Sequence, residues 1–162
     1  MLLKLTLAYA DAHYTQTVYL GSQVVATAGD VIGALPLVPP PWSAVAAVEY
    51  RRPLARNTTL SLRAQDVVHS HNPGPFTTQN PDAVVYAPER ESDPATTRVD
   101  LTATLSWSQL DVAAFVTNLF DAQPTLQRRN RIPGDTLFYA TTFRPRTVGL
   151  SVNWRFGPRI VN

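Results

Sequence analysis

The chain has 162 residues, a formal net charge of +2, 16% charged residues and no cysteine. This length is usual for a single domain, and a small positive charge with no concentrated basic stripe argues against nucleic acid as a partner. The missing cysteines exclude disulfides, thiolate metal sites and cysteine nucleophiles, and no apolar run is long enough for a transmembrane helix.

The first stretch, from Leu2 to about Tyr19, is expected to form one long strand. Leu3, Leu5 and Leu7 alternate with polar or small residues, and this period of two is what a strand produces on its two faces. A signal peptide is the alternative, but Lys4 interrupts an already short apolar run.

A loop over residues 20–42 follows and contains a run of three prolines, which has no N–H to offer a sheet. Residues 44–51 and 58–65 then alternate again, which predicts two strands joined by a short turn. Their shared apolar face would carry Ala44, Ala46, Val48, Tyr50, Leu60, Leu62 and Ala64.

A second long loop covers residues 70–97, and the clearest alternation of the chain comes after it. Residues 98–107 and 110–117 predict a hairpin with a two-residue turn at Ser108 and Gln109. A third long loop, residues 121–144, leads to a final strand that ends near Phe156. The apolar face of these strands would carry Val99, Leu101, Ala103, Leu105, Trp107, Leu110, Val112, Ala114, Val116, Val148, Leu150, Val152, Trp154 and Phe156.

The connections alternate in length, at roughly 23, 6, 27, 2 and 25 residues. Long loops therefore gather at one end of an antiparallel meander and short turns at the other, as in outer-membrane barrels. The prolines, 14 in all, are expected in loops, in turns or at strand ends. A soluble sandwich would instead bury the apolar faces under a second sheet.

Aromatic residues strengthen the membrane interpretation, because they collect at the turn end of the apolar face. An aromatic girdle at the bilayer surface would explain this placement. The charged fraction is also below the roughly 25% that is usual in soluble proteins. The predicted girdle consists of Tyr50, Trp107, Trp154 and Phe156.

Two further sets of residues resemble a known family. Asn118, Leu119, Phe120 and Asp121 form an NLFD element that ends a strand, and the last strand reads PRTVGLSVNWRF. Together they resemble the C-terminal end of TonB-dependent outer-membrane receptors. The matching positions of the last strand include Pro145, Arg146, Gly149, Leu150 and Phe156.

The resemblance implies an all-β fold: an antiparallel up-and-down meander of about six strands that forms part of a transmembrane β-barrel. Residues 1–156 would be the C-terminal strands of a receptor barrel, and residues 157–162 a short extension. The family has a larger barrel and a plug, and we expect the present sequence to contain neither the remaining strands nor the plug. It implies active uptake of a scarce solute such as a siderophore, vitamin or oligosaccharide across the bacterial outer membrane.

Partners implied by the resemblance are outer-membrane lipid and lipopolysaccharide, the missing strands and plug, and the TonB complex acting through the parent receptor. The polar strand faces would line the lumen. Arg128, Arg129 and Arg131 of the third loop would contact an anionic solute or lipopolysaccharide phosphates, unless they form a solvated loop tip. The polar faces carry Lys4, Glu49, Arg51, Arg63, Asp100, Asp111 and Arg155.

Patterns that would support catalysis are weak. His69 and His71 have a spacing that suits a metal, but they have no nearby cysteine or carboxylate partner. Asp100 and Asp111 lie on neighbouring strands, as a glycosidase pair would, yet we expect ladder neighbours in a wet lumen. Without a nucleophile-elbow, phosphate-loop or zinc-protease motif, the chain is predicted to be no enzyme and to need no cofactor.

Two other functions remain as alternatives. A small complete outer-membrane barrel of eight strands, with a structural or adhesive role, would need two more strands, at residues 24–27 and 137–142. A soluble carbohydrate-binding β-sandwich would need its apolar residues buried. The residues that decide between a sandwich and a membrane wall are Val99, Leu101, Leu105, Val148 and Leu150.

Overall fold

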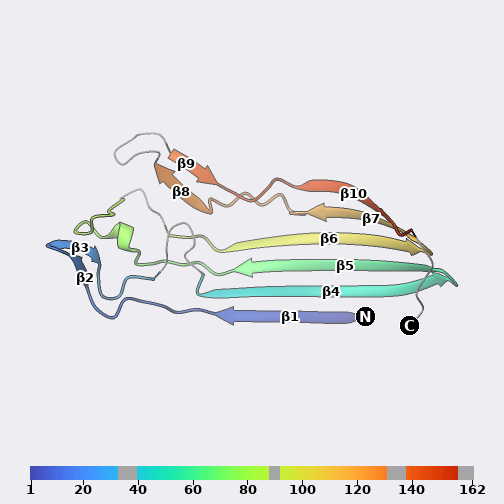
Figure 1. Ribbon diagram of the computed structural model, residues 1–162, viewed down its shortest axis with the longest axis horizontal. Coiled ribbons are helices and arrows are strands. Elements are labelled where there is room, and N and C mark those ends of the chain that lie inside the picture. Colours follow the sequence, from blue (N-terminus) through green and yellow to red (C-terminus); the bar gives the residue numbers. More distant parts are fainter. Residues whose placement is uncertain (33–39, 88–91, 131–137, 157–162) are drawn as a thin grey trace.

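The computed structural model describes residues 1–32, 40–87, 92–130 and 138–156 of the chain. Six long strands form one antiparallel sheet in the order β1-β4-β5-β6-β7-β10, so the predicted meander is confirmed (Figure 1). The sheet is open, with β1 and β10 at its edges, and is not a closed barrel. Its strands are β1 (Leu2–Tyr9), β4 (Trp42–Ala55), β5 (Thr58–His69), β6 (Thr96–Trp107), β7 (Leu110–Thr117) and β10 (Thr147–Trp154).

The register confirms that the predicted apolar faces of all six strands lie on the same side of the sheet. Directly opposed residues in an antiparallel ladder point to the same side. One ladder row runs through Leu3, Val48, Ala64, Leu101, Val116 and Val148. We call this side the apolar face and the opposite side the polar face.

The two short turns lie at one end of the sheet, the turn end, and the three long connections at the other, the loop end (Figure 1). Ser108 has a φ of 52°, which the tight β6–β7 turn requires. The β4–β5 turn is shorter than predicted because β4 continues to Ala55. Pro53 therefore lies inside a strand, contrary to prediction, beside a register shift near the end of β4.

The long connections contain two hairpins of their own, β2 (Val18–Leu20) with β3 (Gln23–Ala26) and β8 (Gln127–Asn130) with β9 (Phe138–Thr141). The prediction of one strand from Leu2 to Tyr19 was therefore wrong beyond Tyr9. Backbone groups there bond to the loop itself, as in the 2.9 Å bond from Tyr14 N to Asp30 O. The alternative of an eight-stranded barrel needs β3 and β9 in the main sheet, but both strands lie outside it.

The first two connections pack together into a small body at the loop end, which we call the loop cap (residues 10–32 and 70–87). Its elements are β2, β3 and the 3-10 helix η1 (Thr77–Gln79). Val24 pairs with Ala83 across the two connections, and Asn80 donates to the Thr27 hydroxyl. Most of the deeply buried residues of the described chain lie here, namely Ala26, Asp30, Asn72, Phe76, Thr78 and Ala83.

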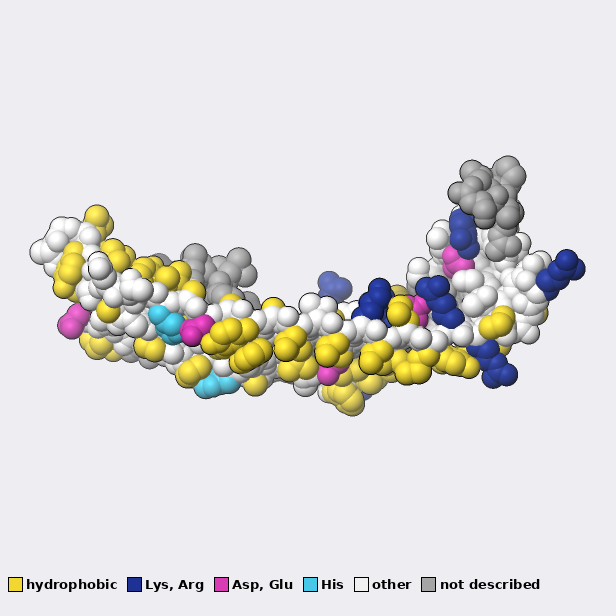
Figure 2. Space-filling view, turned by 90° about the horizontal axis from the view of Figure 1, so that it is seen from below, with side chains coloured by type: hydrophobic (Ala, Val, Ile, Leu, Met, Phe, Trp, Pro, Cys, Tyr) yellow, Lys and Arg dark blue, Asp and Glu magenta, His cyan; other side chains and the backbone are white. Residues whose placement is uncertain are grey.

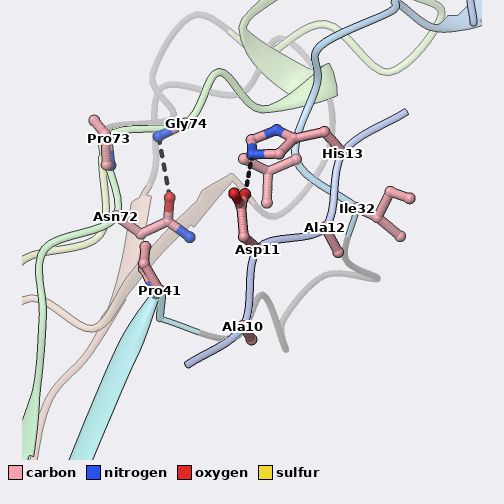
Figure 3. Close-up of a pocket in the computed structure, with 10 residues that line it drawn as sticks. Ala10, Asp11, Ala12, His13, Ile32, Pro41, Asn72, Pro73 and Gly74 are labelled. Carbon is pink, nitrogen blue, oxygen red and sulfur yellow. Dashed lines mark hydrogen bonds and ion pairs between the residues drawn. The ribbon is translucent and has the colours of Figure 1, made fainter. Parts of the chain in front are cut away.

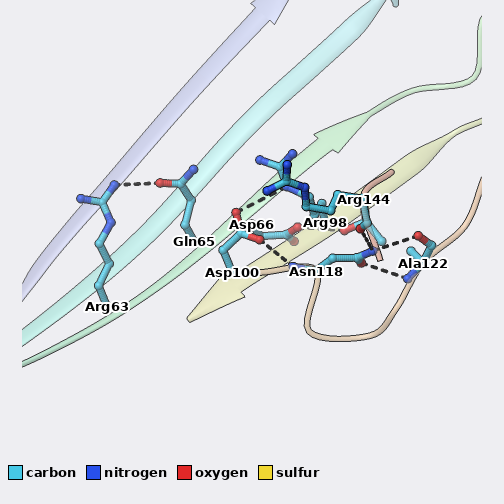
Figure 4. Close-up of polar contacts among 9 residues, drawn as sticks. Arg63, Gln65, Asp66, Arg98, Asp100, Asn118, Ala122 and Arg144 are labelled. Carbon is cyan, nitrogen blue, oxygen red and sulfur yellow. Dashed lines mark hydrogen bonds and ion pairs between the residues drawn. The ribbon is translucent and has the colours of Figure 1, made fainter. Parts of the chain in front are cut away.

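The NLFD element ties the end of β7 to the start of β10. Asn118 is 2% exposed and has a φ of 52°. Its side chain accepts from Ala122 N at 2.9 Å and donates to Ala122 O at 3.0 Å and Arg144 O at 2.9 Å. Figure 4 shows Asn118 between Ala122 and Arg144. Asp121 Oδ1 accepts from Arg146 N at 2.8 Å, so the two family-like segments are bonded to each other.

Gly149 of β10 is required by a neighbouring side chain. It lies opposite Phe115 of β7 on the polar face, and the Phe115 ring covers it. A Cβ at position 149 would lie 2.9 Å from Cε1 and 3.0 Å from Cε2 of that ring, closer than carbon atoms pack.

Gly149→Ala is therefore expected to destabilise the folded chain by about 1–3 kcal/mol, the usual cost of overpacking. Urea unfolding in detergent micelles, followed by tryptophan fluorescence, measures this cost. In a Phe115→Leu background the cost should fall below about 1 kcal/mol, because the ring is gone. An equal cost in both backgrounds would show that the ring is not the cause.

Within the described residues, we find no helix with both the length and the hydropathy that a membrane crossing needs.

Candidate functional site

The apolar face is the most distinctive surface of the described chain, because no layer of protein covers it. Val148 and Leu150 are 72% and 76% exposed and Leu105 is 41% exposed, while Val99 and Leu101 are half-buried. Figure 2 shows hydrophobic side chains aligned along one side of the sheet. Water-soluble monomers rarely leave so extended an apolar surface uncovered.

The apolar band is bounded on each strand, and its borders cross the ladder rows obliquely. The border at the turn end runs from β1 to β10 through Leu3, Tyr50, Leu60, Trp107, Leu110 and the stacked pair Trp154 and Phe156. The border at the loop end runs through Tyr9, Trp42, Val68, Val99, Val116 and Val148. From β1 to β10, both borders shift along the strands toward the turn end.

The slope of these borders gives an angle. Between β1 and β10, the turn-end border shifts along the strands by roughly 8 residues and the loop-end border by roughly 6 residues. With ~3.3 Å per residue and ~4.8 Å between strands, the band is inclined by roughly 40–50° to the ladder rows. Strands of closed and transmembrane barrels tilt by a similar angle, roughly 35–45°.

Aromatic residues mark both borders of the band. Trp154 and Phe156 stack at the turn end with ring centroids 5.8 Å apart, and Tyr9 and Trp42 contact at the loop end at 4.6 Å. The predicted girdle residue Tyr50 lies in the same ladder row as Ala103, four residues along β6 from Trp107, yet Tyr50 and Trp107 belong to the same oblique border. All three tryptophans of the chain are therefore border residues of the apolar face.

The polar face carries the charged residues that the alternation predicts there, and most of them are paired. Arg155 contacts Asp111 at 3.0 Å and Arg63 donates to Gln65 at 2.7 Å. Arg51 pairs with Glu49, and Arg98 lies 3.4 Å from Asp100 (Figure 4). These partners are neighbours on the sheet, so the face is hydrophilic without concentrating one charge.

The weak catalytic patterns do not assemble. Asp111 lies opposite Ser106, six residues along β6 from Asp100, or about 20 Å. A glycosidase pair needs at most about 9.5 Å between its carboxyl groups. His71 contacts the Ser92 hydroxyl at 3.1 Å, and the described residues include no cluster of three possible metal ligands.

The third-loop arginines are only partly accounted for. Arg128 and Arg129 belong to β8, which pairs with β9, but their side chains are not described. Arg131 lies outside the described residues. Contact with an anionic solute therefore stays a prediction.

A small cavity of about 170 Å³ lies where β1 enters the loop cap (Figure 3). Asp11 and His13 form an ion pair at 2.5 Å, and the other ring nitrogen of His13 lies 3.0 Å from Gly29 O. The Tyr9 hydroxyl also donates to Asp11, so this hydrogen bond links the end of β1 to the loop cap.

Two charged residues on the apolar face were missed by the sequence analysis. Arg52 lies opposite Leu60, and Asp66 lies between Ala46 and Val99. Asp66 accepts from the Thr97 hydroxyl at 2.8 Å, near the loop-end border. The alternation itself contains the signal, since Arg52 is two residues after Tyr50, but we assigned it to the turn.

Comparison with protein-family models, curated proteins and solved structures gives no match for this chain.

Proposed function

We propose that this chain is a C-terminal barrel segment of a TonB-dependent outer-membrane receptor that takes up a scarce solute. The observation that carries the proposal is the oblique apolar band, which is uncovered, bordered by aromatics and inclined as transmembrane strands are. In this role the apolar face meets lipid, the polar face lines the lumen and the loop cap lies outside the cell.

The contacts around the NLFD element add support. The motif residues Asn118 and Asp121 are bonded to the backbone of Arg144 and Arg146, where the closing strand begins. The resemblance to the receptor family therefore rests on residues that act together in the fold. The edges β1 and β10 would pair with the remaining barrel strands, because backbone groups within lipid need partners.

A soluble carbohydrate-binding sandwich has less support. It requires Leu105, Val148 and Leu150 to be buried, and all three are exposed on a single sheet. A complete eight-stranded barrel also has less support, because the main sheet of the described residues contains six strands.

Depth-dependent quenching of tryptophan fluorescence tests the proposal. With the chain refolded into vesicles, lipids brominated high on the acyl chain should quench more strongly than lipids brominated at the chain end, because Trp42, Trp107 and Trp154 are border residues. Variants that retain only Trp42 or only Trp154 should behave alike, since they occupy opposite borders. A soluble monomer that unfolds cooperatively without detergent, with no lipid quenching, would refute it.

A further inference from the structure

Two arginines at the turn end differ from the others in where they lie. The register puts Arg52 on the apolar face, directly opposite Leu60 and two residues beyond Tyr50. Arg56 lies in the two-residue turn between β4 and β5, and both side chains belong to exposed residues. Both therefore stand at the turn-end border of the apolar band.

Their lack of protein partners is the second difference. On the polar face, Arg51 and Arg155 each pair with a carboxylate, and Arg63 donates to Gln65. Neither Arg52 nor Arg56 has an ion pair or side-chain hydrogen bond within the described part of the chain. A guanidinium at the edge of hydrocarbon needs an anion, and these two take none from the residues that the structure describes.

The surroundings of the two arginines favour one kind of anion. Asn57, next to Arg56, accepts from Ser108 N at 3.0 Å, so the two short turns lie side by side. This brings the arginines to the border that Trp107 and Trp154 mark. Indole rings favour the headgroup level of a bilayer, where lipid phosphates lie.

We propose that Arg52 and Arg56 bind the headgroup phosphates of anionic phospholipids in the leaflet at the turn end. The planar guanidinium forks match phosphate oxygens, and the long side chain of Arg52 reaches from the apolar face to the headgroups. This inference rests on the proposed membrane location. It adds to that location a class of lipid and the two residues that bind it.

The nearest carboxylate on the same face does not compete for these arginines. Asp66 lies six residues along β5 from Leu60, the partner of Arg52, or about 20 Å away. Asp66 is also bonded to Thr97. The site therefore presents two positive charges to lipid with no counter-charge of its own among the described outward-facing residues.

The experiment compares insertion of the full chain into phosphatidylcholine vesicles with and without phosphatidylglycerol, at low ionic strength. Insertion is measured by protection from protease and by the blue shift of tryptophan emission. Anionic lipid is expected to raise the insertion constant of the wild type roughly tenfold, a gain that physiological salt reduces. The R52Q/R56Q variant should lose most of this gain.

A matched control removes two positive charges from the polar face. The R63Q/R155Q variant has the same net charge as R52Q/R56Q, and it should keep the preference for phosphatidylglycerol. Loss of the preference in both variants would reduce the effect to net charge and overturn the assigned site.

The remaining outcomes separate the inference from the proposed function. Equal insertion of the wild type into both vesicles overturns the inference alone, whereas no insertion into either also overturns the membrane location. Inorganic phosphate should reduce the preference no more than chloride at the same ionic strength. A stronger effect of phosphate would assign the two arginines to free phosphate instead of lipid.

Discussion

The substitution Ala103→Arg, in the middle of the apolar band, is expected to weaken folding into lipid by about 2–4 kcal/mol. Ala103 lies on β6 between Leu62 and Ala114, and its side chain points to the uncovered apolar face. A guanidinium at this depth would meet acyl chains, far from either border. The measurement is urea-driven unfolding from vesicles, followed by tryptophan emission.

The neighbouring residue Thr104 is the matched control, because it follows Ala103 directly but lies on the polar face opposite Ser61. Thr104→Arg is expected to change the free energy of unfolding by less than about 0.5 kcal/mol, as at a wet surface. If both variants lose the same stability, the two faces do not differ in their surroundings. In that case the apolar face does not meet lipid.

Asn118→Ala is expected to cost about 3 kcal/mol of folding stability, because the buried Asn118 side chain makes three hydrogen bonds to the backbone. It would leave the backbone N–H and C=O of Ala122 and the C=O of Arg144 without their side-chain partner. It also puts an ordinary residue at a φ of 52°, which asparagine tolerates better. Urea unfolding in micelles measures the loss.

Two further variants divide this cost. Asn118→Gly removes the same hydrogen bonds but accepts the backbone angle, so it should be about 1 kcal/mol more stable than Asn118→Ala. Asn153→Ala, an exposed asparagine on the polar face of β10, should cost less than about 0.5 kcal/mol. A small loss for Asn118→Ala would mean that water replaces the side chain.

Strand order and the face of most strand side chains were predictable because both depend on local alternation. A period of two assigns a residue to a face with no knowledge of its neighbours. Short turns then force consecutive strands to pair, as β6 and β7 do at Ser108 and Gln109. The sequence therefore predicted the six-stranded sheet and the difference in length between the connections at its two ends.

The features that the sequence did not predict depend on contacts between distant segments. The β2–β3 hairpin is held by residues about 60 positions away, as in the bond from Val84 N to Val24 O. The same holds for the buried contacts of Asn118, whose partner Arg144 lies on the far side of the third loop. The oblique border was also hidden, since it needs the register between strands and not only the pattern within each.

The uneven distribution of burial has a consequence for engineering this chain. Ala26, Phe76 and Ala83 are enclosed within the connecting segments, whereas the long strands keep their widest apolar surface open. In most domains the connections accept redesign and the strands do not. Here we expect the reverse: exchanges among apolar residue types should be tolerated on the apolar face of the strands, whereas new segments grafted between the strands would remove most of the buried residues of the described chain.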